Sequence, residues 1–150
     1  MLSYDKLFSR VLNKINDPKE LSLDESDLLA IYTERLHSVI GKPRVRRLFS
    51  SITLDDEIQE MTFTLNHSVD KYADEDFVLE VLTLGMVIEW LQPQVDSLKY
   101  VVQMVGGKEE KMMQNHYKPM QERLENLKVE LNKMIRDYGY MYNSYIKGDL

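Results

Sequence analysis

The residues from Phe77 to Leu91 constrain the fold of this chain more than any other stretch. They read Phe-Val-Leu-Glu-Val-Leu-Thr-Leu-Gly-Met-Val-Ile-Glu-Trp-Leu, and Glu80, Thr83 and Glu89 are the polar interruptions. At about 100° per residue the two glutamates point to opposite sides of a helix, so no continuous polar stripe exists. The sequence therefore predicts a central helix that its neighbours bury on all sides.

Burial of this helix requires the rest of the chain to wrap it. Leaving its large apolar side chains in water would cost roughly 1.5–3 kcal/mol each, which together exceeds the stability of a typical domain. A chain of 150 residues with 43% hydrophobic content is large enough to form one domain with a proper core. We therefore predict a single, mainly α domain over residues 1–150, a helical bundle around a buried central helix.

Two helices are predicted before the central one. Ser3 is the expected N-cap of a short amphipathic helix, which Asn16-Asp17-Pro18 breaks. Ser22-Leu-Asp-Glu25 matches a capping box and predicts the start of a second helix of about five turns. Gly41 before Pro43 predicts the end of that helix.

A β-hairpin excursion is predicted at about residues 43–70. Apolar residues alternate with threonine in Met61-Thr-Phe-Thr-Leu65, which is typical of a strand. Leu48 to Leu54 is a weaker strand candidate, and Asp55-Asp56-Glu57 can form the turn between the two. Because a two-stranded ribbon is only marginally stable alone, it is expected to pack on the helices or on a partner.

The central helix is expected to begin near Asp74 and to reach Leu91. Pro93 then predicts either its end or the first turn of another helix, which the apolar spacing from Val95 to Val105 supports. Gly106-Gly107 permits a reversal of the chain.

A long C-terminal helix is predicted from a heptad seam. Its apolar residues are spaced alternately by four and three: Met113, Tyr117, Met120, Leu124, Leu127, Leu131, Met134, Tyr138, Met141 and Tyr145. Such a stripe packs lengthwise against another helix, either in the same chain or in a neighbouring subunit. Pro119 predicts a kink or a restart, and Glu125 with Lys128 and Glu130 with Lys133 are expected surface pairs.

No motif in the sequence predicts catalysis, a metal site or a cofactor. Cysteine is absent, and His37, His67 and His116 stand in no recognised ligand pattern. Since Glu80 and Glu89 are expected on opposite faces, they are better explained as anchoring charges than as an acid–base pair. We expect a soluble intracellular protein, because the N-terminus lacks an apolar signal region and residues 77–91 are too short and too charged to span a bilayer.

Charge is unevenly distributed along the chain. The net charge of −6 disfavours wrapping of nucleic acid by a basic surface. Residues 51–105 contain eleven acids and two bases, whereas residues 42–47 contain Lys42, Arg44, Arg46 and Arg47 and no acid. The basic cluster is interpreted as a docking patch for an acidic protein surface, with phosphate binding and a solvated loop as the alternatives.

The C-terminal tail, about residues 138–150, is rich in aromatic residues. It includes Tyr138, Tyr140, Tyr142 and Tyr145. Aromatic side chains are enriched where protein interfaces are buried, so the tail is predicted to be an interface element. Packing within the chain is the main rival explanation.

Taken together, these features resemble the head–tail connector (adaptor) proteins of tailed bacteriophages. The features are an N-terminal helix pair, a short β-excursion, a buried helix ending in Glu89-Trp90-Leu91-x-Pro93, a Gly-Gly break, an Asn115-His116 step and a long terminal helix. The match is best from Phe77 to Tyr145.

This resemblance implies a structural virion protein without catalysis or cofactor, made in the host cytoplasm and located in the neck of the virion. Such adaptors form a ring, usually dodecameric, that grips the portal protein and presents a surface to the next neck or tail component. DNA passes through the ring without specific binding, and no membrane is involved. The acids Asp55, Asp56, Glu57 and Glu60 are then expected to face the channel, where carboxylates repel phosphate.

The resemblance also suggests roles for the candidate interface residues. The excursion, with Arg44, Arg46, Arg47 and Phe63, is expected to reach a neighbouring ring. The tyrosines of the tail are expected to dock on the portal. The alternative function is a small acidic helical regulator or inhibitor that acts by protein binding, monomeric or dimeric through the seam, and an enzyme is the third possibility.

Overall fold

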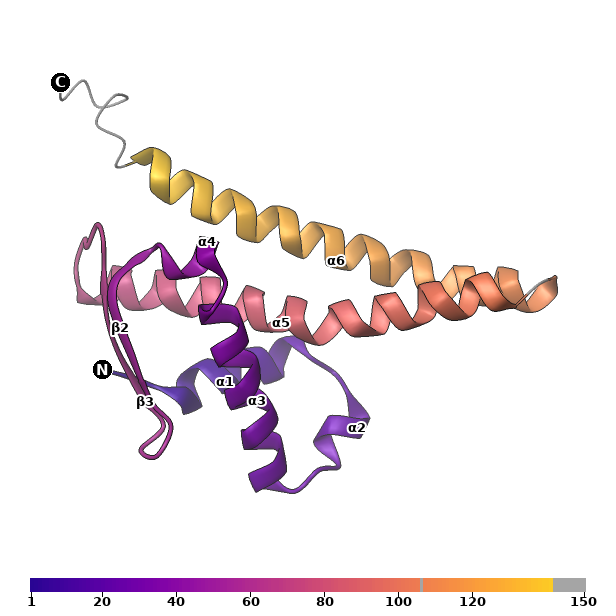
Figure 1. Cartoon of the computed structure of the whole chain (residues 1–150), viewed down its shortest axis with the longest axis horizontal. Helices are drawn as coiled ribbons and strands as arrows, with labels where there is room; N and C mark the ends of the chain where they lie inside the picture. Colours follow the sequence, from indigo (N-terminus) through magenta and orange to yellow (C-terminus); the bar gives the residue numbers. More distant parts are fainter. Residues whose placement is uncertain (106, 142–150) are drawn as a thin grey trace.

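The computed structural model describes residues 1–105 and 107–141, and it confirms a mainly α fold. A long helix, α5 (Lys71–Met104), runs through the molecule. α1 (Tyr4–Lys14), α3 (Glu25–Ile40) and α6 (Lys108–Met141) pack on it. In Figure 1, α6 runs alongside α5 while α3 crosses it. The predicted bundle around a central helix is therefore correct.

The stretch that was predicted to be buried is the core of α5. Val78, Leu82 and Met86 are at most 1% exposed, and Thr83 is buried among them. The helix starts earlier than predicted, because the Asp70 carboxylate accepts a hydrogen bond from the amide of Ala73 and caps the first turn.

The predicted break at Pro93 is wrong, since α5 continues through it to Met104. A proline inside a helix removes one hydrogen bond of the backbone ladder. In the same turn the Gln94 side chain donates to the Trp90 carbonyl at 3.1 Å, which supplies an additional bond. Val95 and Val102 beyond the proline are buried, so packing continues along the same helix.

Glycine at position 85 sets how closely α3 approaches α5. A Cβ atom at this position would lie 2.5 Å from Cγ1 of Val39 on α3. Because Gly85 has no side chain, the two helix backbones can cross at close range, and Val39 fills the space.

The start of α3 differs in detail from the predicted capping box. Asp24 occupies the N-cap position, and its side chain makes no capping hydrogen bond. Ser22 instead ends a four-residue helix that was not predicted, α2 (Pro18–Leu21), by donating from its hydroxyl to the Lys19 carbonyl. The first cap was predicted correctly, since the Ser3 hydroxyl accepts from the amide of Asp5.

The heptad seam of α6 packs against α5 of the same chain. Leu124 is 2% exposed, and the other described members of the seam from Tyr117 to Tyr138 pack at the edge of the core. The helix is continuous through Pro119. Neither expected surface pair, Glu125 with Lys128 or Glu130 with Lys133, is among the ion pairs of the described residues.

The predicted hairpin is present as β2 (Phe49–Asp55) and β3 (Glu60–Leu65). A third antiparallel strand, β1 (Leu2–Ser3), pairs with β3 so that Leu2 lies opposite Met61. Two residues are too few to give a strand pattern, so the sequence could not predict β1. β1 links the hairpin to the start of α1, where the Tyr4 amide donates to the Gln59 carbonyl at 2.9 Å.

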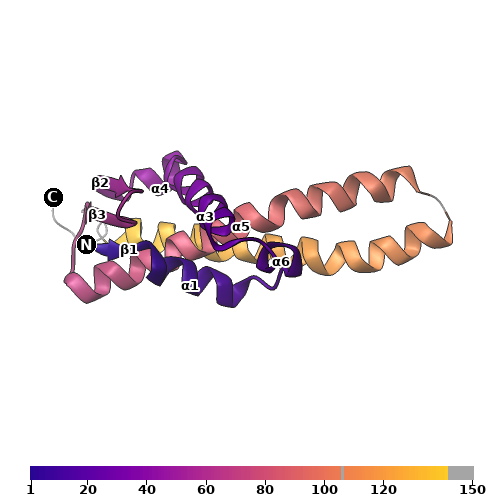
Figure 2. The ribbon, with the colours of Figure 1, turned by 90° about the horizontal axis from the view of Figure 1, so that it is seen from below.

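The far end of the α5–α6 pair extends beyond the rest of the molecule, as Figures 1 and 2 show. Around this end, Tyr100, Met104 and Met112 are exposed. The chain therefore has a compact body and a projecting two-helix arm.

Candidate protein-binding surfaces

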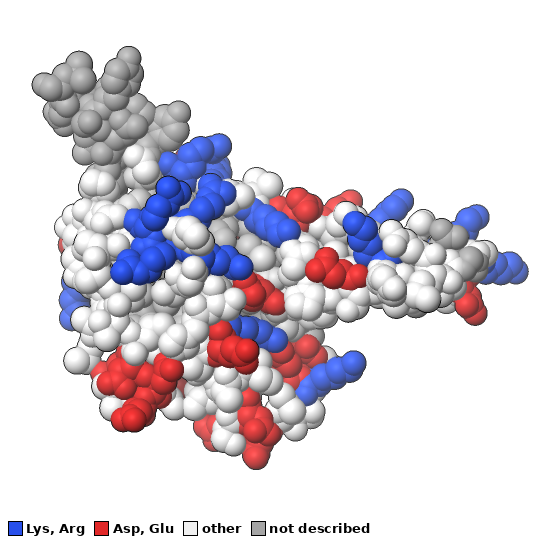
Figure 3. Space-filling model, in the orientation of Figure 1, with Lys and Arg blue, Asp and Glu red and all other residues white. Residues whose placement is uncertain are grey.

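The clearest candidate surface is the basic cluster on α4 (Pro43–Arg46), a short helix that the sequence did not predict. Pro43 stands in its first turn, and Val45, 2% exposed, anchors it to the core. The side chains of Arg44, Arg46 and Arg47 remain exposed. Figure 3 shows Lys and Arg side chains gathered over α4. We call Lys42, Arg44, Arg46 and Arg47 the basic surface.

Contacts to neutral oxygens hold two of these arginines without cancelling their charge. Arg44 donates to the Asn132 side chain on α6 at 2.7 Å, and Arg46 donates to the Phe49 carbonyl at 3.1 Å. None of the three arginines forms an ion pair with another residue in the described part of the chain. A guanidinium has five N–H donors, so each keeps donors for a partner. Lys42 differs, because its Nζ lies 2.9 Å from Glu89.

The four acids predicted to face a channel have different surroundings. Asp55 closes the β2–β3 turn by accepting from the amides of Glu57 and Ile58. Glu57 is exposed, and Glu60 is half-buried on β3. The structure therefore brings these acids to one turn without giving them one orientation.

Asp56, the fourth acid, is engaged within the chain. Its Oδ1 accepts from the Tyr4 hydroxyl at 2.6 Å, and its carboxylate lies 2.8 Å from Nε2 of His37. The Tyr4 hydrogen bond, followed by that of His37, lowers the pKa of Asp56, while burial raises the pKa of Tyr4. Asp56 thus clamps the turn to α1 and α3, a role that the sequence did not reveal because the three residues are far apart in it.

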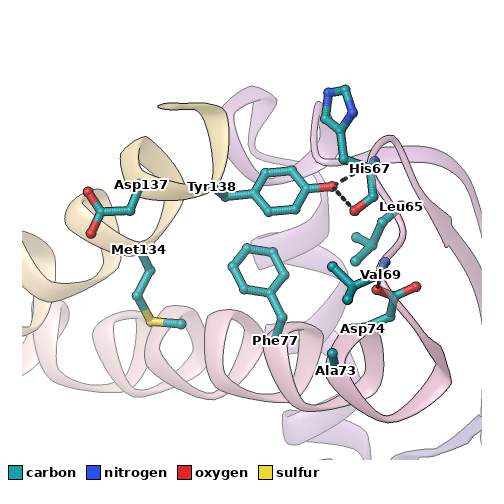
Figure 4. Close-up of a pocket in the computed structure, with 9 residues that line it drawn as sticks. All are labelled: Leu65, His67, Val69, Ala73, Asp74, Phe77, Met134, Asp137 and Tyr138. Atoms are coloured by element: carbon teal, nitrogen blue, oxygen red, sulfur yellow. Dashed lines mark hydrogen bonds between the residues drawn. The ribbon is translucent and has the colours of Figure 1, made fainter. Parts of the chain in front are cut away.

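Tyr138 packs inside the chain at the end of α6. Its ring stacks on Phe77 with centroids 4.7 Å apart, and its hydroxyl accepts from the His67 amide at 2.8 Å. Figure 4 shows the pair beside a pocket of about 330 Å³, with Leu65, Val69 and Met134 among its apolar walls. For Tyr138 the rival explanation, intrachain packing, applies. Tyr142, Tyr145 and the side chain of Tyr140 lie outside the described residues.

Phe63 also contributes to the interior. It is half-buried on β3 and meets Phe49 edge to face, with centroids 5.9 Å apart. Its expected contact with a partner stays a prediction.

The two glutamates of the central helix are anchoring charges, as the sequence suggested. Glu80 pairs with Arg10 on α1 at 3.0 Å, whereas Glu89 pairs with Lys42, the N-cap residue of α4. Their partners lie on different elements, so the two carboxylates do not share a site.

No metal-binding geometry is seen in the residues that the structure describes, where no three His, Cys, Asp or Glu residues converge. Likewise, none of the described helices has the length and apolar content needed to cross a membrane.

A second pocket, which the sequence did not predict, lies beside the basic surface. It lies between α4, α5 and α6 and has a volume of about 420 Å³. Lys42, Gly85 and Lys128 belong to its walls, which come from parts of the chain that no spacing rule connects.

Comparisons with protein-family models, with curated proteins and with solved structures found no match to this chain.

Proposed function

We propose that this protein is a structural connector of a tailed bacteriophage, which joins the portal protein to the next neck or tail component. In this proposal, copies of the chain form a ring, usually dodecameric in such adaptors, and DNA passes through it without specific binding. The chain is made in the host cytoplasm and located in the virion neck. The sequence resemblance supports the specific assignment, and the geometry supports the more general role of protein binding.

The observation that carries the proposal is the basic surface. Arg44, Arg46 and Arg47 project from a short helix that buried Val45 fixes, and they have no counter-charge among the described residues. Positive charge held in a fixed position is suited to an acidic protein surface, where arginine forms paired hydrogen bonds with carboxylates. The concentration of arginines on one surface, in a chain whose net charge is −6, favours a role in docking on a partner.

The acids at the opposite end of the hairpin suit the same role. Asp55 and Glu57 lie at the β2–β3 turn, which is the far end of β2 from α4, and both are exposed. A seven-residue strand is roughly 20 Å long, so the acids of the turn are well separated from the basic surface. Acids that line a passage would repel DNA phosphates and let DNA slide.

The test is binding to the portal protein encoded by the same genome. Purified chain and portal rings are mixed, separated by size and imaged by electron microscopy. We expect the chain to be found as a ring on one end of the portal. Absence of binding at any ratio would contradict the connector assignment.

Charge reversal tests the surface itself. Arg44→Glu, Arg46→Glu and Arg47→Glu together should abolish binding to the ring on which the basic surface docks, whether that is the portal or the next neck component, while the chain stays folded. Lys14→Glu, Lys71→Glu and Lys99→Glu form the matched control, because these exposed lysines lie elsewhere and the net charge changes by the same amount. Equal loss of binding in both variants would mean that only net charge matters.

The alternative, a small helical regulator, shares the basic surface but requires no portal. Its dimeric form through the seam is disfavoured, because α5 already covers Leu124 and its neighbours. Light scattering across concentrations, with and without a portal, distinguishes the two: a connector should assemble on the portal, whereas a regulator should keep the same oligomeric state whether or not a portal is present.

A further inference from the structure

The pocket between α4, α5 and α6 is lined by both aliphatic and positively charged side chains. Val45, Ile88 and Leu131 provide aliphatic surface. Concave sites with apolar walls and a few converging polar groups are the usual form of a binding pocket. Lys42 of the basic surface lines the pocket, and Val45, another lining residue, stands between Arg44 and Arg46, so the pocket is continuous with the basic surface.

The charges around this pocket do not balance. Lys128 lines it and is half-buried, yet it forms no ion pair with any described residue. Lys42 is paired with Glu89 at 2.9 Å, and Arg44 reaches the wall through its hydrogen bond to Asn132. The pocket and its wall thus have three cations and one carboxylate, and a half-buried ammonium without a counter-ion favours the binding of an anion.

We propose that this pocket binds a carboxylate on an aliphatic stem, supplied by an acidic side chain of the partner protein that docks on the basic surface. The carboxylate pairs with Lys128 and shares Lys42 with Glu89, while its stem and a neighbouring aliphatic residue lie on Ile88 and Leu131. The inference rests on the proposed function, because that function supplies the partner protein whose acidic side chain enters the pocket beside the arginines. A protein is the source because the pocket and the arginines form one continuous surface.

A peptide probe tests the pocket without any portal. The probe is the capped peptide acetyl-Ser-Leu-Glu-Leu-Ser-amide, in which glutamate carries the only charge, and its match has glutamine in that place. Binding to the full chain is followed by NMR of the methyl groups of Val45, Ile88 and Leu131, with Leu7 and Val11 of α1 as distant references. We expect saturable shifts at the pocket methyls, and binding about tenfold weaker for the glutamine peptide because a charge-assisted bond is lost.

Two variants of α6 locate the charge. Lys128→Gln should weaken binding of the glutamate peptide about fivefold or more. Lys133→Gln is the matched control, since it removes the same charge from an exposed residue of the same helix that does not line the pocket. Circular dichroism and thermal unfolding verify that both variants fold as the parent chain does.

Three results would overturn the proposal. They are equal binding of the two peptides, equal effects of Lys128→Gln and Lys133→Gln, and shifts confined to methyls outside the pocket. Sodium hexanoate is the further probe: binding as strong as that of the glutamate peptide would identify a small-molecule site in place of a docking anchor. Failure of the portal experiment with these peptide results intact would instead remove the phage assignment and keep the pocket.

Discussion

The two halves of α5 share one backbone conformation but have opposite surroundings. Between Phe77 and Leu91, residues such as Leu82 and Val87 are fully buried, because α1, α3 and α6 all pack around this half. Beyond Val95, Tyr100 and Met104 are 67% and 74% exposed, and α6 is the main neighbour. A continuous helix therefore does not imply a continuous core, and the stability of the molecule should be concentrated in the first half.

The largest expected effect comes from shortening a core side chain in the buried half. Leu82→Ala should lower the free energy of unfolding by about 2–5 kcal/mol, since Leu82 is 0% exposed and leaves a cavity. Leu98→Ala, the same change at a half-buried position of the arm, should cost only about 1 kcal/mol. Urea denaturation followed by circular dichroism measures both, and equal costs would break the comparison.

The next effect tests the close crossing of α3 and α5. Gly85→Ala places a methyl group 2.5 Å from Cγ1 of Val39, so we expect a loss of about 1–2 kcal/mol after the gain in helix propensity is counted. Val39→Ala removes the clash, and the double variant should be more stable than the sum of the two single changes predicts. Strict additivity in the double-mutant cycle would show that the two residues do not meet.

This crossing illustrates what the sequence could and could not predict. The unbroken apolar run of 77–91 predicted burial, and the heptad spacing from Tyr117 to Tyr138 predicted lengthwise packing, because both patterns are local and repeat along a helix. That glycine 85 faces Val39, or that the seam meets α5 of its own chain, depends on contacts between distant segments. Helix propensity likewise predicted a break at Pro93, and tertiary packing overrode it.

The candidate sites follow the same division. The sequence identified the arginines of the basic surface as a charge cluster, but it did not predict the helix α4 that presents them. Lys128 was assigned to a surface pair with Glu125, whereas it lines a pocket together with residues between 39 and 93 and with Leu131 and Asn132 of its own helix. Asp56 was grouped with its acidic neighbours by composition, and its hydrogen bonds to Tyr4 and His37 separate it from them.

An anchor of intermediate strength ties the buried half of α5 to the start of α2. The indole N–H of Trp90 donates to Asp17 at 3.0 Å, and this hydrogen bond is the largest of the effects that lower the pKa of Asp17. A carboxylate whose pKa is lowered by folding stabilises the protein above its unfolded pKa, 3.8, and this contribution is lost as the pH falls through the folded value.

Asp17→Asn should therefore cost about 1 kcal/mol at neutral pH, and the difference from the parent should shrink below pH 3.8. Asparagine keeps an oxygen acceptor for Trp90 and for the α2 cap, so the change chiefly removes the charge. Chemical denaturation at a series of pH values gives the difference directly. A difference that stays constant from neutral to acid pH would show that the charge is not what strengthens the contact.

The smallest expected effect lies on the outer face of the arm. Tyr100→Ser and Met104→Ser change two exposed side chains four residues apart, so each should alter the free energy of unfolding by less than about 0.5 kcal/mol. The matched change in the buried half, Met86→Ser, should be severely destabilising, because Met86 is 0% exposed and a hydroxyl would enter the core. Amide hydrogen exchange adds a local measure: residues 97–104 should exchange faster than residues 78–91, since fewer neighbours protect the arm. Equal protection in the two halves would mean that the arm is held by contacts as extensive as those of the body, and the contrast on which these predictions are built would be lost.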